Sequence, residues 1–212
     1  MTRKRVFSTT NANGLVAAAL SILFVATLSA RAAQIGSSAP DFHGTDSNGK
    51  MQSLDQYRGK FVVLEWHNHD CPYTMKHYES GNMQSLQKDW TAKGVVWFTV
   101  ISSAPGTQGY VDGSQENAYL KKMNAKPTAA ILDPKGDIGH LYDAKTTPNM
   151  FIIDPGGKLI YAGAIDDHAT TEVSDIQSSK NYVSAALTEA MAGQAVQTPV
   201  TRPYGCSVKY LR

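Results

Sequence analysis

Short apolar runs separated by polar, turn-forming stretches predict alternating strands and helices along this chain. Four runs are nearly continuous and partly β-branched, as expected of strands covered on both faces; they lie at 61–66, 95–101, 128–132 and 150–153. The turn sequence at 154–157, Asp-Pro-Gly-Gly, follows the last run and predicts a hairpin whose return strand is 158–164.

Helical patterns fill the intervals between these strands. They lie at 74–93, with a weak point at Gly81-Asn82, at 114–123, with Ser114 as the expected N-cap, at 138–142 and at 173–192. A polar turn at 46–50 predicts a short hairpin before the first strand. The order of elements predicts one α/β domain with a mixed central sheet flanked by helices, containing one right-handed βαβ unit.

The first 32 residues have the layout of a secretory signal peptide. A basic start is followed by the apolar run 15–28 and by Ala30-Arg31-Ala32, a cleavage pattern. The run is short for a membrane span, so an uncleaved anchor is the weaker alternative. Cleavage changes the net charge from +2 to −2, because it removes four basic residues and no acidic one. The rest of the chain has no basic stripe, which argues against a nucleic-acid partner. We expect an exported protein, periplasmic or secreted, with no stable membrane span after cleavage.

Cys71 lies where the strand 61–66 passes into a helix. Pro72 suits the first helical turn, where its missing N–H is not needed. Unpaired N–H groups and partial positive charge at a helix N-terminus favour a thiolate, so this position predicts a reactive cysteine. Cys206 is the second cysteine of the chain. In an exported protein, counting alone leaves one structural disulfide between the two as an equal alternative.

In order and spacing, several segments resemble the thioredoxin fold in its redoxin branch, the AhpC/TSA peroxiredoxin-like and TlpA-like proteins. Residues 39–42, Ala-Pro-Asp-Phe, resemble the N-terminal extension of that branch, and 66–71 with the helix after it resembles the active site. Thr147-Pro148 before an apolar strand resembles the cis-proline segment. The resemblance implies a thioredoxin-like redoxin domain at 33–192 with its N-terminal extension, followed by a C-terminal tail at 193–212.

A subgroup of redoxin-domain proteins is similar in two further motifs. Residues 71–78 read Cys-Pro-Tyr-Thr-Met-Lys-His-Tyr and residues 204–210 read Tyr-Gly-Cys-Ser-Val-Lys-Tyr. The chain departs from ordinary thioredoxins at Thr74, which replaces the second cysteine of Cys-x-x-Cys. A thiol that resolves a bond on Cys71 must therefore come from Cys206 or from another molecule.

By resemblance, Pro148 follows a cis peptide bond and packs against Cys71, while the backbone of Thr147 pairs with an incoming peptide or thiol. An ordinary trans turn proline is the alternative at Pro148. Glu65 corresponds to the buried acid of thioredoxins, where it resembles a proton relay for the second thiol. Because that thiol is missing here, a salt bridge from Glu65 to Lys76 or Lys60 is an equal alternative.

Lys76 and His77 follow Cys71 by about one and a half helical turns, so a cation there would lower the pKa of the thiol. Two solvated helix residues are the alternative. His67, His69 and Cys71 alternate as His-x-His-x-Cys, types of ligand that suit copper(I) or zinc. An obvious fourth ligand is missing, so we expect these histidines to tune the thiol and expect no cofactor. Asp166 and His168 lie on a polar loop that could border the site.

These residues favour an exported thiol-dependent oxidoreductase, an enzyme of the thiol–disulfide or peroxiredoxin-like antioxidant type. Cys71 would attack a disulfide or peroxide, with Cys206 resolving the product and a thiol or disulfide protein, a small peroxide and an external reductant as partners. Asn68 stands near the position where peroxiredoxins carry Thr or Ser, and the sequence assigns no arginine to polarise a peroxide, although Arg202 or Arg58 could serve. The alternative class is a redox-inert or metal-binding, copper-chaperone-like module with a structural Cys71–Cys206 disulfide. The sequence does not indicate an oligomeric state.

Overall fold

A computed structural model describes residues 1, 2, 4 and 33–211 of the chain. The predicted signal peptide, apart from residues 1, 2 and 4, lies outside this range. Among the helices that the structure describes, none is both long and apolar enough to cross a membrane.

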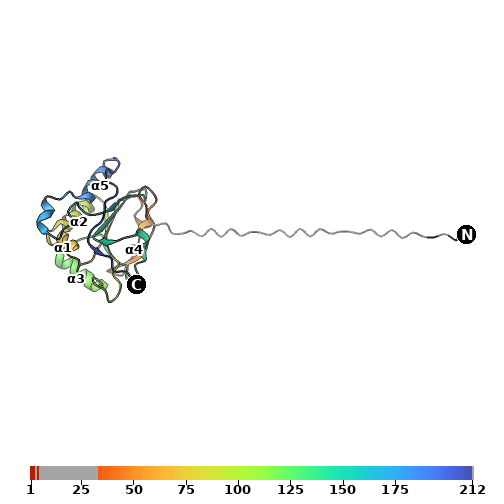
Figure 1. The fold of residues 1–212 in the computed structure, drawn as a ribbon, viewed down its shortest axis with the longest axis horizontal. Helices are drawn as coiled ribbons and strands as arrows, with labels where there is room; N and C mark the ends of the chain where they lie inside the picture. The colour runs from red at the N-terminus through yellow and green to blue at the C-terminus, as the bar shows by residue number, and fades with distance from the viewer. Residues whose placement is uncertain (3, 5–32, 212) are drawn as a thin grey trace.

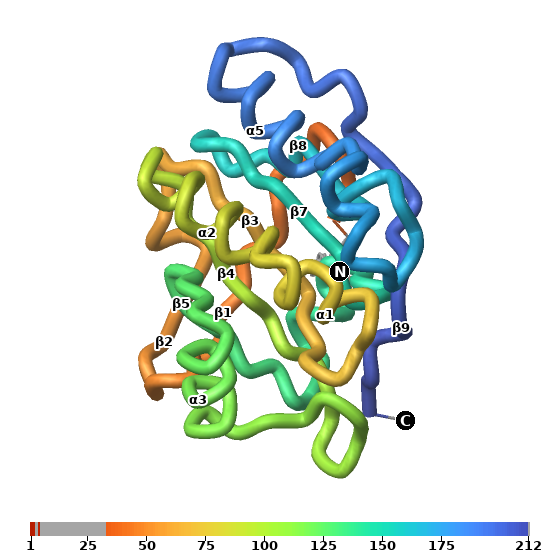
Figure 2. Tube along the Cα trace, turned by 90° about the vertical axis from the view of Figure 1, so that its left-hand side faces the viewer, coloured from red at the N-terminus to blue at the C-terminus, as the bar shows by residue number. Residues whose placement is uncertain are grey.

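Seven strands form one mixed sheet in the order β2-β1-β5-β4-β3-β7-β8 (Figure 2). Their bounds are β1 His43–Asp46, β2 Met51–Ser53, β3 Val62–Trp66, β4 Val96–Ile101, β5 Ala129–Leu132, β7 Asn149–Ile153 and β8 Leu159–Gly163. The central strands β3, β4 and β5 are parallel, whereas β7 pairs antiparallel with β3 and β8 antiparallel with β7. The mixed sheet and the N-terminal hairpin predicted from the sequence are confirmed.

Helices cover both faces of the sheet (Figure 1). Their bounds are α1 Pro72–Glu79, α2 Asn82–Ala92, α3 Gly113–Met123, α4 Asp137–Tyr142 and α5 Tyr182–Met191, with 3-10 turns η1 Leu54–Tyr57 and η2 Val173–Gln177. Side chains of α1, α2 and α5 pack on one face with Val63, Trp97 and Ile152. Those of α4 pack on the other face with Leu64 and Phe98, because neighbouring residues of a strand point to opposite faces. Both apolar clusters are buried, as the continuous apolar strands predict.

The weak point predicted at Gly81-Asn82 is confirmed as a break in the helix, whereas two other predicted helix starts are wrong, each for a local reason. The helix expected at 74–93 divides into α1 and α2 because Gly81 has a left-handed backbone, with φ of 77°. Asp112, not Ser114, is the N-cap of α3, and it exchanges hydrogen bonds with Gln115 in a capping box. The last helix begins only at Tyr182, where the Asn181 side chain caps it.

The C-terminal tail is more ordered than the irregular segment that the sequence predicts. From the end of α5 it runs back along one edge of the molecule to the C-terminus (Figure 2). Its residues Cys206–Ser207 form strand β9, which pairs antiparallel with β6, Thr146–Thr147. Backbone hydrogen bonds from Ala162 to Pro199 and from Ala104 to Lys209 fix the tail on either side. Held by these bonds, the tail runs from the edge of the sheet to the N-terminal end of α1.

Candidate active site

Cys71 is the N-cap of α1, with Pro72 in the first turn as predicted. The loop before it is held by Asn68, whose side chain accepts from the Asp70 N–H at 2.8 Å and whose carbonyl accepts from the Cys71 N–H at 3.0 Å. Strand β3 and this loop therefore fix the cysteine at the helix start. The Cys71 side chain is fully buried, with 0% exposure.

The β6–β7 segment closes one side of Cys71. The peptide bond between Thr147 and Pro148 is cis, so the predicted cis-proline is confirmed. Cys71 Sγ donates a hydrogen bond to the Thr147 carbonyl at 2.9 Å. Thr147 itself is buried. This geometry brings together three of the residues that the sequence singles out.

Strand β9 brings the second cysteine to the same place. In the β6–β9 register Thr147 lies opposite Cys206, and the Thr147 carbonyl accepts from Cys71 Sγ, so the strand pair brings Cys206 next to Cys71. Gly205 makes this approach feasible, because a Cβ there would lie 2.1 Å from the Thr147 carbonyl oxygen. Both cysteines are reduced. The structure thus places side by side two thiols that are 135 positions apart in the chain.

The two thiols have opposite pKa shifts. Burial raises the pKa of Cys71, but the neighbouring Cys206 thiol and the backbone N–H groups of Cys206 and Thr74 outweigh it, so the pKa of Cys71 lies below its ordinary value. Burial, then the hydrogen bond and charge of Cys71, raise the pKa of Cys206 to about 11. Of the two, Cys71 is the one that becomes the thiolate first, with Cys206 as hydrogen-bond donor.

Glu65 is buried among neutral hydrogen-bond donors, and its proposed role as a proton relay stays a prediction. It is fully buried, accepts from Tyr78 Oη at 2.8 Å and Trp97 Nε1 at 2.8 Å, and is further bonded by Gln87 and Thr99. The salt bridge expected to Lys76 or Lys60 is wrong, because these neutral donors satisfy the carboxylate instead. Glu65 organises the core beneath the site and makes no hydrogen bond to either thiol.

Lys76 and His77 contact the loop and tail around Asp166. Both are buried, so the alternative of two solvated residues is wrong. Lys76 Nζ donates to the His168 carbonyl at 2.7 Å and lies 3.5 Å from Asp166 Oδ2. The cation therefore pairs with the buried carboxylate of Asp166, and the expected effect of Lys76 on the pKa of Cys71 stays a prediction.

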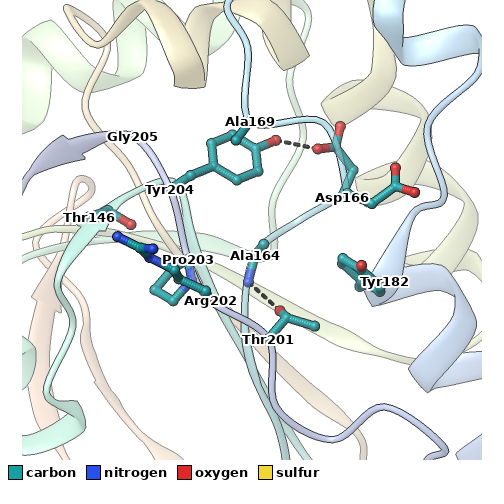
Figure 3. Close-up of a pocket in the computed structure, with 11 residues that line it drawn as sticks. Thr146, Ala164, Asp166, Ala169, Tyr182, Thr201, Arg202, Pro203, Tyr204 and Gly205 are labelled. Carbon is teal, nitrogen blue, oxygen red and sulfur yellow. Dashed lines mark hydrogen bonds between the residues drawn. The ribbon is translucent and has the colours of Figure 1, made fainter.

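Asp166 and Tyr204 complete this group, which we call the tail latch: Lys76, His77, Asp166 and Tyr204. Tyr204 Oη donates to Asp166, and His77 Nε2 lies 3.3 Å from Tyr204 Oη (Figure 3). Burial lowers the pKa of His77 to about 4, against the opposing charge of Asp166. Sequence reasoning missed Tyr204. The signal was its place two residues before Cys206 in the Tyr-Gly-Cys motif.

His67 and His69 form no metal site with Cys71. His67 is buried between the rings of Tyr78 and Tyr119, and His69 lies 3.3 Å from Asp70. Across the described part of the chain, no three His, Cys, Asp or Glu side chains are arranged to hold a metal ion. Both ring nitrogens of His67 and both carboxylate oxygens of the buried Glu116 lack a hydrogen-bond partner among the described residues. These groups form a buried polar layer beneath the loop 67–70.

A pocket of about 600 Å³ opens beside the tail (Figure 3). It is lined by Thr146, Gly205 and Tyr204 on the side of the thiols, and by Asp167 and Arg202 near the solvent. The side chains of Asp167 and Arg202 are exposed. The pocket therefore connects bulk solvent with the residue next to Cys206.

The fold and the paired thiols define a thioredoxin-like redox protein. The AhpC/TSA family matches residues 35–162, and the chain belongs to this family. It is 31% identical over 127 residues to the thiol-disulfide oxidoreductase ResA of Bacillus thuringiensis subsp. konkukian (strain 97-27), covering 60% of this chain and 68% of the relative. The same figures hold for the protein of that name in Bacillus cereus (strain ATCC 10987 / NRS 248).

Solved structures agree on the fold. An uncharacterized conserved protein from Geobacillus kaustophilus superposes with a TM-score of 0.71 at 21% identity, over 84% of this chain and 93% of its own. A protein from Chlorobium tepidum assigned as thiol:disulfide interchange protein DsbE has a TM-score of 0.50 at 26% identity, over 62% of this chain and 85% of its own. The predicted thioredoxin-like fold is confirmed, and the family supports a thiol redox function.

Proposed function

We propose that this protein is a thiol–disulfide oxidoreductase whose redox pair is Cys71 and Cys206. The observation that carries the proposal is the β6–β9 pairing, which sets the two thiols against each other at the N-terminus of α1. In the cycle, Cys71 is the nucleophile and Cys206 its resolving partner. Closing the Cys71–Cys206 bond passes two electrons to a substrate disulfide, which leaves as two thiols.

Thr147 and Pro148 position this chemistry. Thr147 lies opposite Cys206 in the strand pair, and its carbonyl accepts from Cys71 Sγ. Pro148 turns the chain so that the Thr147 carbonyl faces the helix N-terminus. The names of the relatives, ResA and DsbE, describe thiol–disulfide exchange and favour a thiol or disulfide protein as partner. Glu65 and Lys76, with hydrogen bonds to other groups, act through the surrounding structure.

A small peroxide is the second candidate oxidant. The Cys71 thiolate would attack one peroxide oxygen and release water or an alcohol, and Cys206 would displace water from the sulfenic acid to form the same disulfide. Arg202 lines the pocket beside Gly205, whereas Arg58 is bonded to Asp55 and to the Gly156 carbonyl. Disulfide exchange is the better-supported reaction, because the named relatives perform it.

The domain limits and the export of the protein are also part of this proposal. The signal peptide would span 1–32, the redoxin domain 33–192 and the tail 193–212. A disulfide-forming pair is suited to the periplasm or the exterior of the cell, where such bonds persist. N-terminal sequencing of the secreted protein tests the cleavage, and a mature chain that still begins at Met1 would contradict it.

The redox role is tested with the purified protein. An excess of oxidised glutathione, a model disulfide, should remove both free thiols and lower the mass by two hydrogens. Cys71→Ser and Cys206→Ser should each fail to close the bond, and the second should accumulate a mixed disulfide with a monothiol disulfide. The same measurement with hydrogen peroxide in place of the disulfide shows which of the two oxidants reacts faster with the protein. Full thiol loss in Cys71→Ser would contradict the proposal, and a metal-loaded or unreactive protein would favour the binding module.

A further inference from the structure

The two cysteines differ in how they face the solvent. Cys71 has 0% exposure and lies beneath the Thr147 carbonyl and the tail. Cys206 is partly exposed, on a short strand at the edge of the molecule (Figure 2). An outside molecule can therefore approach Cys206 with the tail in place, whereas Cys71 is covered.

We propose that substrate thiols attack the oxidised protein at Cys206 and that Cys71, on the inner side of the bond, is the sulfur that leaves. This inference rests on the proposed redox function. The oxidised protein then acts as a disulfide donor, and its substrates are thiol-bearing peptides that reach Cys206 Sγ. The order differs from the expectation drawn from the sequence, in which Cys71 meets the substrate first.

The exchange balances in two steps. A substrate thiolate attacks Cys206 Sγ, a new bond joins substrate sulfur to Cys206, and the bond to Cys71 breaks, which leaves Cys71 as a thiolate. A second substrate thiolate then attacks the substrate sulfur of that mixed disulfide and releases Cys206, which takes up a proton. The net result is one substrate disulfide and two protein thiols. A disulfide or peroxide of the kind proposed above restores the Cys71–Cys206 bond.

The leaving group supports this direction. A thiol of low pKa leaves a disulfide faster, and the N-terminus of α1, where the backbone of Thr74 donates a hydrogen bond to Cys71, favours the Cys71 thiolate in the mixed disulfide as well. Cys206 lies on strand β9 and is the poorer leaving group. Attack at Cys206 therefore has the better leaving group as well as the open approach.

The pocket of Figure 3 is where the substrate would lie. It ends at Gly205, the residue before Cys206, and at Thr146 in the paired strand. Within the described residues, Arg202 forms no hydrogen bond or ion pair, so its guanidinium is available to a carboxylate. Asp167 lines the same pocket, and since its Oδ1 is bonded to His168 and the Lys180 N–H, its Oδ2 is the oxygen that suits an ammonium group. A small cysteine-containing peptide, with both groups and a thiol, matches this arrangement.

A trapping experiment tests the order. Wild-type protein is oxidised, the loss of two hydrogens is checked by mass, glutathione is added, and the reaction is quenched in acid within seconds. Alkylation with N-ethylmaleimide and peptide mapping should find glutathione on Cys206 and maleimide on Cys71, at least ten times as often as the reverse. Equal or reversed labelling overturns the order while the proposed function survives. If no disulfide forms before glutathione is added, both fail.

A second measurement tests the pocket. Glutathione is anionic at neutral pH, whereas cysteamine carries an ammonium group and no carboxylate. Arg202→Gln should slow reduction of the oxidised protein by glutathione about three- to tenfold and leave the cysteamine rate unchanged. Lys135→Gln removes an equal charge outside the pocket and is the control, with no change for either thiol. Equal slowing of both thiols, or none, overturns the assignment of the pocket.

Discussion

Gly205 is the residue on which the approach of the two cysteines depends. Its φ of 125° lies outside the range that other residues readily adopt, and its Cα faces the Thr147 carbonyl oxygen. Because a Cβ would meet that oxygen at 2.1 Å, a side chain there has to push β9 away from β6. The glycine therefore sets the distance between the sulfurs without contributing any chemistry.

Gly205→Ala should slow closure of the Cys71–Cys206 bond at least tenfold, because the strand that carries Cys206 is displaced. The rate of thiol loss after addition of excess oxidised glutathione measures this. Gly193→Ala is the control, since Gly193 also has a positive φ, of 73°, but its Cβ would meet nothing within 4 Å. A normal closure rate in Gly205→Ala would show that β9 tolerates the shift.

The pKa of Cys71 provides the pH prediction at this scale. A thiol whose pKa is lowered is a thiolate at every pH above that pKa, so the reduced protein should gain absorbance at 240 nm at a pH below the ordinary value of 9.0. Cys206→Ala removes a hydrogen-bond donor and should move the midpoint to higher pH. Cys71→Ser should remove the transition altogether. If the midpoint is the same in Cys206→Ala as in the wild type, the Cys206 thiol does not lower the pKa of Cys71.

At the scale of elements, the sequence predicted the strands and the α1 N-terminus well and the tail poorly. Continuous apolar runs identified β3, β4, β5 and β7 because these strands are buried on both faces. Strand β9 and its partner β6 have two residues each. Two residues are too few to show a pattern of hydrophobic and polar positions. The partners expected for Lys76 and Glu65 were wrong for a related reason: the partners found, Asp166 and Trp97, are far away in the sequence. Spacing along one helix or strand cannot identify such contacts.

The tail latch gives the prediction for the element β9. Tyr204→Phe removes the hydroxyl that bonds Asp166 and faces His77, and leaves the ring that packs near Tyr73. Because the carboxylate of Asp166 is buried, the variant should lose about 1.5–3 kcal/mol of unfolding free energy, measured with urea. It should also close the Cys71–Cys206 bond several-fold more slowly.

The matched control is Tyr110→Phe. Tyr110 is 40% exposed, and its hydroxyl forms no hydrogen bond within the described range, so the same atom is removed from the surface. Its unfolding free energy and closure rate should both equal those of the wild type. A Tyr204→Phe protein that behaves like this control would mean that the latch does not hold the tail.

For the whole molecule, the bond between Cys71 and Cys206 would close a loop of about 135 residues. In the chain-entropy account such a loop stabilises a protein by about 5 kcal/mol. The reduced state is favoured in turn by the hydrogen bonds that stabilise the Cys71 thiolate. The oxidised protein should therefore be more stable than the reduced one by less than this value, as urea unfolding with and without dithiothreitol measures.

The double variant Cys71→Ser/Cys206→Ser is the control for that measurement. Its unfolding should be the same with and without dithiothreitol. If the wild type also unfolds identically under both conditions, the two thiols do not form a bond in the folded protein. A gain in the oxidised state well above 5 kcal/mol would instead indicate a structural disulfide that resists reduction.

The long separation between Cys71 and β9 has a consequence for biosynthesis. A ribosome completes Cys71 well before it reaches Cys206, so the growing chain presents a lone thiol for most of its synthesis. Throughout that interval Cys71 can join the wrong partner, and an incomplete chain has no internal thiol to reverse the error. The site becomes a pair only when the tail has been made and has docked. Cells that produce this protein should therefore benefit from a disulfide isomerase, most of all when translation is slow.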